Sequence, residues 1–383
     1  MNRETRLGRT PRLASPRRGV ALHLGVAAWL ACMLFPVPAP AADAPDATAL
    51  QAGPLPGRHA LLLFVAYRGN LDVPLHPTQL RVSAGRRLAD AFAVRGGTFV
   101  TYPDVEPLMR EWRVRSERDL ALPFLEALAD AFDVEHVTIL KLVTYDDRVL
   151  LLGRTLSPRT GRLEWADVAE GVQGADLWER PDDAAARLDR LVDECASALL
   201  AGVSPALPEG SPGLVALPLL PVGLDRGEGD LAWQCLLGSL LRSERWNVAD
   251  PSLVVNEMQR GGFDPRFLDP RARQYLAEAF AASGLLVPRM TAFPRAGERV
   301  TPAALVFDDT PVSAQLERRV PVLFTLSLVD GASGTVIAGG ARYLTPEKAT
   351  GLFGRSTRRQ MIRRYQESAD ELVRSLLTTE GTI

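Results

Sequence analysis

The amino-acid sequence predicts an α/β protein with an α+β tendency, built from two tandem βαβαβββα modules in which helices pack on a mixed sheet. The first observation is a repeated helix-to-strand passage. Residues 128–132 lead into the apolar run 137–140, and residues 276–280 lead into 285–287. The second observation is that a turn-linked strand pair and a long amphipathic helix follow both passages. Right-handed crossovers between such elements place the helices of each copy against one sheet.

The first copy, residues 58–202, opens on a continuous apolar run at 60–66, which suits a strand covered on both faces. Apolar residues at helical spacing then predict a helix that ends at Gly96 and Gly97. The remaining elements are predicted as a strand at 98–102, a helix at 120–132, strands at 136–143, 149–156 and 163–168, and a closing amphipathic helix at 182–200.

The second copy, residues 213–383, restarts after a linker at 203–212 that is rich in Pro, Gly and Ser. It carries one addition, the insertion 294–321, which is longer than an ordinary connection and is expected to be functional or disordered. Its predicted elements are a strand at 214–220, a helix at 230–241, a strand opening at 246–248, a helix at 271–283, strands at 285–291, 323–330 and 335–343, and a closing helix with an apolar face from 361 to 377.

Residues 1–41 have the three parts of a secretory signal peptide. An arginine-rich start precedes an apolar stretch, and the small residues at 39–41 form a cleavage site. The apolar stretch is too short for a comfortable membrane-spanning helix, so the sequence predicts export to the periplasm. Lipidation at Cys32, which would give an outer-membrane lipoprotein, is the minority alternative because Trp29 fits a lipoprotein cleavage site poorly.

Removal of the signal peptide takes away six arginines and one glutamate, which changes the formal net charge from −2 to −7. An acidic chain lacks the basic surface of a nucleic-acid-binding protein, so nucleic acid is excluded as a partner. Residues 42–57 are rich in Ala, Pro and Asp without an apolar period, and they predict a disordered tether.

Cys195 and Cys235 are the two cysteines that remain in the mature chain, and an oxidising compartment could pair them. Cys195 continues the apolar stripe of the first closing helix, whereas the face on which Cys235 lies is less well defined. A disulfide requires Cα atoms within about 7 Å, and the sequence does not establish that separation. A disulfide between the modules and two free thiols are both open alternatives.

The repeated passage resembles a known group of envelope domains. The helix at 126–134 and its following strand at 137–140 resemble the amino-terminal domain of TolB and the curli-secretion protein CsgG. The hairpins with Thr160-Gly161 and Ser333-Gly334-Thr335 show the same resemblance. In that pattern an aspartate often ends the strand before the turn, and only the second copy has it, as Asp330.

The resemblance covers most of residues 59–202 and 213–378. The group also includes penicillin-binding-protein activators such as LpoB. The resemblance therefore implies a domain that assembles or regulates other envelope proteins and is not an enzyme. The curli exporter forms a ring, so an oligomer is a further implication of the resemblance.

The sequence predicts no catalytic, cofactor or metal site. His59, His76 and His136 are not at metal-ligand spacing, and the chain lacks a phosphate-binding loop and a Gly-x-Ser-x-Gly elbow. Asp308 and Asp309 are the least explained of the paired carboxylates. An enzymatic function would require them to meet His76 or His136.

Two surfaces are predicted to bind partners. The first is an arginine cluster around the start of the last helix, where cations oppose the helix dipole unless an anion compensates them. The alternative for this cluster is a solvated face paired with Glu367 and neighbouring acids. The second is a patch within the insertion. The residues are Arg355, Arg358, Arg359, Arg363 and Arg364 in the cluster, and Leu305, Val306, Phe307, Asp308 and Asp309 in the patch.

These features predict a non-enzymatic, secreted periplasmic protein that binds or scaffolds cell-envelope components through protein–protein contacts, without a cofactor. The partner is expected to be an envelope protein. The alternative is a periplasmic small-ligand sensor that binds its ligand between the two modules.

Overall fold

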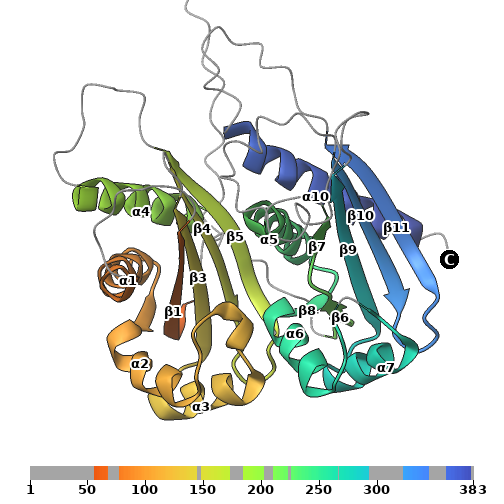
Figure 1. The fold of residues 1–383 in the computed structure, drawn as a ribbon, viewed down its shortest axis with the longest axis horizontal. Coiled ribbons are helices and arrows are strands. Elements are labelled where there is room, and N and C mark those ends of the chain that lie inside the picture. The colour runs from red at the N-terminus through yellow and green to blue at the C-terminus, as the bar shows by residue number, and fades with distance from the viewer. Residues whose placement is uncertain are drawn as a thin grey trace, which may run out of the picture. The chain divides into compact units, whose positions relative to one another are not determined.

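The computed structural model describes residues 56–67, 77–144, 148–172, 184–201, 210–222, 226–265, 267–292, 322–344 and 359–380, which contain two sheets with helices packed on them (Figure 1). These residues belong to one compact unit. The predicted signal peptide, most of the tether and linker, and the insertion 294–321 lie outside the described residues. Within the described part, no helix combines the length and hydropathy that a membrane span requires.

The first module matches the predicted order of elements, with one helix more. Its five-stranded sheet has the order β2-β1-β3-β4-β5. Strand β1 is parallel to β2 and β3, and the later pairs are antiparallel. The elements are β1 (Gly57–Tyr67), α1 (Pro77–Ala93), β2 (Gly97–Val100), α2 (Tyr102–Glu111), the 3-10 helix η1 (Glu117–Asp119), α3 (Leu122–Phe132), β3 (His136–Thr144), β4 (Arg148–Leu156), β5 (Leu163–Val172) and α4 (Ala184–Leu200).

The second module repeats this topology. Its sheet has the order β11-β10-β9-β6-β8, with β7 also paired to β9, so β8, β6, β9, β10 and β11 correspond to β2, β1, β3, β4 and β5. The predicted α/β architecture of two tandem modules is therefore confirmed. The elements are β6 (Gly213–Ala216), β7 (Leu220–Val222), α5 (Arg226–Arg242), β8 (Asn247–Ala249), α6 (Pro251–Arg260), α7 (Pro270–Ala279), β9 (Gly284–Ala292), β10 (Val322–Asp330), β11 (Val336–Leu344) and α10 (Arg359–Glu380).

The repeat extends to the backbone conformation of individual residues. Positive φ angles, which non-glycine residues rarely adopt, recur at equivalent turns of both modules. A register shift also falls at the same place in both hairpins, between Thr155 and Leu156 and between Leu328 and Val329. The equivalent positive-φ pairs are Gly96 and Glu244, Arg113 and Gly262, Asp133 and Ala281, and Gly161 and Gly334.

Two helices were missed in the sequence, and they are equivalent to each other. Helices α2 and α6 both lie where the sequence predicts no helix. In α2 the apolar residues Tyr102, Val105 and Met109 share one buried face, but Pro107 interrupts the pattern. In α6 the signal was the helix start: the Asp250 side chain accepts hydrogen bonds from the Ser252 and Leu253 amides, and Pro251 follows the cap.

A smaller correction concerns the first strand of the second module. One strand was expected at 214–220, but the structure has two short strands, β6 and β7, which both pair with β9. Pro218 lies between them and has no backbone N–H to donate to a neighbouring strand, so the ladder is interrupted there.

The described elements form alternating layers (Figure 1). Helices α1 and α4 cover one face of the first sheet, and α5 and α10 lie between the first and second sheets. Because α5 is apolar on both sides, it packs against α10 and against β5 of the first module. The fold therefore fills one face of the first module's sheet with a helix from the second module.

Candidate functional site

Three of the ten residues predicted to bind partners belong to the described chain, and all three lie in α10. The side chains of Arg363 and Arg364 are described, whereas only the backbone of Arg359 is. Arg363 Nε lies 2.7 Å from Glu367 Oε1, one helical turn away. This pair matches the alternative of a compensated, solvated face. Arg355, Arg358, the five patch residues, His76 and Cys32 lie outside the described residues.

The two cysteines are free thiols. Cys195 belongs to the core cluster with Leu151 and Trp165, whereas Cys235 belongs to the cluster with Leu152 and Ala166. Since successive residues of a strand point to opposite faces, the first sheet separates the two thiols. The disulfide alternative is therefore not what the structure shows. Burial raises the pKa of Cys195 to about 12 and the pKa of Cys235 above its ordinary range, so both are unreactive thiols.

The structure brings His59 and His136 together, although nothing in the sequence pattern indicates that they pair. They are register partners on β1 and β3, and their ring centroids are 4.8 Å apart. His59 is buried and its Nδ1 lies 2.9 Å from Thr138 Oγ1. His136 Nδ1 lies 2.8 Å from Glu164 Oε2. The described residues contain no group of three or more metal-ligating side chains, so this pair is not part of such a cluster.

The hydrogen bond between His136 and Glu164 predicts that the stability of the protein depends on pH. The hydrogen bond to Glu164, with the nearby charge of Glu135, raises the pKa of His136 above its ordinary value in spite of partial burial. The folded state therefore binds a proton more tightly than the unfolded state. Its contribution to stability is fully present below the unfolded pKa and is lost as the pH rises through the folded pKa. We expect His136→Asn to remove this dependence, measured by denaturant unfolding at pH 5.5 and 8.5. Equal pH dependence in both chains would contradict the assignment.

Polar side chains and backbone groups of the two modules contact each other. The hairpin of β4 and β5 reaches the second module, where Arg162 Nη1 donates to the backbone oxygen of Asn247 at 2.7 Å. The Asp250 amide donates to the backbone oxygen of Gly161 at 3.0 Å. Asn256 of α6 donates to the backbone oxygen of Arg118 in η1 at 2.6 Å. Backbone and side chains of both modules are therefore fitted to each other.

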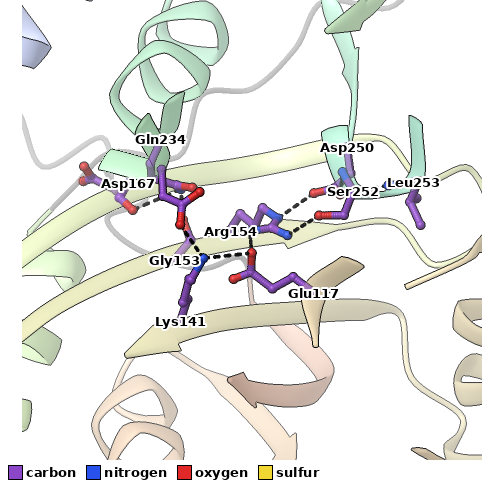
Figure 2. A network of polar contacts seen from close by, with 10 residues as sticks. Glu117, Lys141, Gly153, Arg154, Asp167, Gln234, Asp250, Ser252 and Leu253 are labelled. Carbon is purple, nitrogen blue, oxygen red and sulfur yellow. Dashed lines mark hydrogen bonds and ion pairs between the residues drawn. The ribbon is translucent and has the colours of Figure 1, made fainter. Parts of the chain in front are cut away.

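A buried ion network lies at the centre of this contact (Figure 2). Arg154 Nε lies 2.6 Å from Asp250 Oδ2, and the Asp250 side chain is fully buried. The same carboxylate caps α6, so one aspartate orders a helix of the second module and neutralises a cation of the first. Arg154 Nη2 also donates to Ser252 Oγ at 2.9 Å.

A second cation extends the network. Lys141 Nζ lies 2.7 Å from Asp230 Oδ2 of α5 and 3.7 Å from Glu117 Oε2. Burial alone would lower the pKa of Lys141, but the carboxylates of Glu117 and Asp230 outweigh it and raise the pKa. The pKa of Arg154 is raised in the same way by Asp250 and Glu117. Both groups stay protonated, so neither is a base or a nucleophile, and the network holds the modules together.

Helix α5 contacts the first sheet through Asp230, Gln234 and Gly238, which lie four residues apart on one side of the helix. Gln234 Nε2 donates to the backbone oxygen of Gly153 at 2.6 Å and to that of Asp167 at 3.2 Å. At Gly238 an added Cβ would lie 3.1 Å from the backbone oxygen of Ala166. An acid, an amide and a glycine therefore let this helix lie directly on the sheet.

The surface that α5 and its neighbours cover has an equivalent in the second module. Strand register matches nine residues of the first sheet, which we call the covered face, with nine residues of the second sheet, which we call the open face. Seven residues of the covered face are buried, whereas no residue of the open face is buried. The covered face is Ile139, Lys141, Val143, Leu150, Leu152, Arg154, Ala166, Val168 and Glu170, and the open face is, in the same order, Val287, Arg289, Thr291, Leu323, Thr325, Ser327, Gly339, Ala341 and Tyr343.

Gly340 of β11 faces α10, because an added Cβ there would lie 3.1 Å from Leu372 Cδ2. Its strand neighbours Gly339 and Ala341 therefore point to the opposite side of the second sheet, away from α10. Tyr343 is 65% exposed. The open face mixes apolar, small and hydroxyl side chains with one cation, Arg289.

Comparison with known proteins gives weak likenesses. No protein-family model matches the chain, and no match was found among curated proteins. Among solved structures, lipoprotein GNA1162 from Neisseria meningitidis is 14% identical over 37% of this chain and 88% of its own, with a TM-score of 0.24. The LpoB C-terminal domain from Escherichia coli is 15% identical over 32% and 87%, with a TM-score of 0.24. The PelC dodecamer from Paraburkholderia phytofirmans is 16% identical over 46% and 91%, with a TM-score of 0.23. Likenesses at these TM-scores do not show what this chain does.

Proposed function

We propose that this chain is a non-enzymatic periplasmic protein that binds a cell-envelope protein through the open face of its second sheet. The observation that carries the proposal is the residue-by-residue equivalence of the open and covered faces. In the first module this surface binds a helix, and in the second module none of its nine residues is buried. An exposed, partly apolar sheet face that has a protein-binding equivalent in the same chain supports protein binding.

Secretion and envelope location rest on the predicted signal peptide and on the resemblance to TolB, CsgG and LpoB domains. They belong to the same proposal. The arginine cluster and the patch in the insertion stay proposed as additional contacts. Arg363 is the least favoured member, since Glu367 already compensates its charge.

The ligand-sensor alternative is less favoured. It places a small molecule between the two modules, where the structure packs α5 on β5 and fills the polar centre with the Arg154–Asp250 and Lys141–Asp230 pairs. A ligand in that position would have to displace buried ion pairs, at a cost of several kcal/mol for each charge left without a partner.

A crosslinking pull-down from the periplasm tests the proposal. The intact chain is compared with Ala341→Arg, which places a large cation in the open face, and with Asp90→Arg on the exposed side of α1. We expect a specific envelope protein to be captured by the intact chain and by Asp90→Arg, and to be lost with Ala341→Arg. The absence of any specific partner, or equal capture by all three chains, would contradict the proposal. A deletion of residues 296–319 tests the insertion separately.

A further inference from the structure

The helix that occupies the covered face defines the chemistry that this type of surface accepts. Asp230, Gln234 and Gly238 lie four residues apart and therefore on one side of α5. The acid neutralises Lys141, and the amide donates to two backbone oxygens of neighbouring strands. The glycine allows the helix backbone to approach β5. This face therefore binds a helix with an acidic residue and a small residue on its contact side.

The open face keeps the features that this helix recognises. Arg289 stands at the position of Lys141, is exposed, and has no ion-pair partner among the described residues. Gly339 and Ala341 stand at the positions of Ala166 and Val168, so the sheet surface there is at least as flat. A helix laid across β9, β10 and β11 would reach the cation and the small residues together.

A second copy of the chain is a poor occupant. The element equivalent to α5 is α1, and both helices precede an equivalent left-handed residue, Gly96 or Glu244. Counting back from these residues, the stripe Asp230, Gln234 and Gly238 corresponds to Val82, Arg86 and Asp90. Helix α1 therefore places an apolar residue opposite Arg289 and a second cation beside it. The charge of the open face is not complemented by α1.

We propose that the open face binds an amphipathic helix of another protein, an inference that rests on the proposed function. A carboxylate of that helix pairs with Arg289, and a small residue of the helix lies over Gly339 and Ala341. The partner is identified by this pattern: an acidic residue, an amide or other donor, and Gly or Ala at successive i, i+4 positions, flanked by apolar residues. Leu323 and Tyr343 at one end of the face supply the apolar contact.

A designed probe tests this chemistry. It is a soluble, fluorescently labelled helical peptide that carries the Asp, Gln and Gly stripe of α5 on one side, titrated against the mature chain by anisotropy. We expect saturable binding that weakens at least about tenfold with Arg289→Glu, a change that corresponds to about 1.4 kcal/mol. A matched peptide with Lys in place of the Asp should prefer the Arg289→Glu chain. The control Arg86→Glu, on the exposed side of α1, should bind the first peptide as the unchanged chain does.

Absence of saturable binding, or equal binding to the Arg289→Glu and Arg86→Glu chains, would overturn the inference. A pull-down with the same variants distinguishes failure of the helix-binding inference from failure of the proposed function. If a specific envelope partner is still captured while the peptide fails, the open face does not take an acidic helix but the chain still binds a protein. If no partner is captured by any chain, the proposed function itself is wrong.

Discussion

Replacing Asp250 with alanine is expected to destabilise the protein by about 3–5 kcal/mol, because it leaves the Arg154 guanidinium buried without its nearest carboxylate. The same change removes the side-chain cap of α6, which alone is worth about 1 kcal/mol. Urea unfolding of Asp250→Ala, followed by tryptophan fluorescence and circular dichroism, measures the loss as a lower midpoint.

Two comparison variants separate the buried pair from general effects of charge removal. Asp130→Ala breaks the exposed pair of Asp130 with Arg159, in which both side chains are about two-thirds exposed, and should cost less than about 1 kcal/mol. The double variant Arg154→Met, Asp250→Ser removes both charges and keeps a capping hydroxyl. It should recover much of the stability. If Asp250→Ala and Asp130→Ala have the same urea-unfolding midpoint, the buried ion network around Arg154 does not stabilise the contact between the modules.

Placing leucine at Gly238 is expected to destabilise the protein by about 1–3 kcal/mol, because the side chain has to enter the closely packed contact between α5 and β5. An added Cβ at Gly238 already lies 3.1 Å from the backbone oxygen of Ala166, so the helix must shift away from the sheet. The shift would also lengthen the hydrogen bonds of Gln234 to Gly153 and Asp167. Thermal and urea unfolding report the loss.

The repeat supplies a matched control for this substitution. Asp90 is the equivalent residue of α1 and is exposed, so Asp90→Leu should change stability by less than about 0.5 kcal/mol. The two variants place the same side chain at the same position of equivalent helices. Equal effects would mean that α5 does not lie against the first sheet as described.

Most elements could be predicted because their hydrophobic pattern is long and regular. The three strands β3, β4 and β5 and their equivalents match the predicted segments within a few residues, and so do the closing helices. The two missed helices, α2 and α6, are short. Pro107 lowers the helix propensity of α2, and the β-branched pair Val254-Val255 lowers that of α6. A prediction from periodicity alone does not resolve ten-residue helices of this kind.

The candidate site was harder to predict, because it arises from contacts between modules. Lys141, Arg154 and Asp250 are far apart in the chain, and each is an ordinary charged residue within its own segment. The open face is recognised only when strand register aligns Arg289 with Lys141 and Ala341 with Val168. The sequence did reveal the repeat itself, and the repeat makes that comparison possible.

Thiol labelling at two equivalent positions, Val168→Cys in the covered face and Ala341→Cys in the open face, tests whether the same surface is covered in one module and open in the other. The native thiols Cys195 and Cys235 are buried and give a slow background. We expect Ala341→Cys to react at nearly the rate of an unfolded thiol, whereas Val168→Cys should react only as the modules separate or the protein unfolds. Addition of the captured envelope partner should then protect Ala341→Cys. Equal labelling rates at the two positions in the free protein would mean that the second module does not leave this face open.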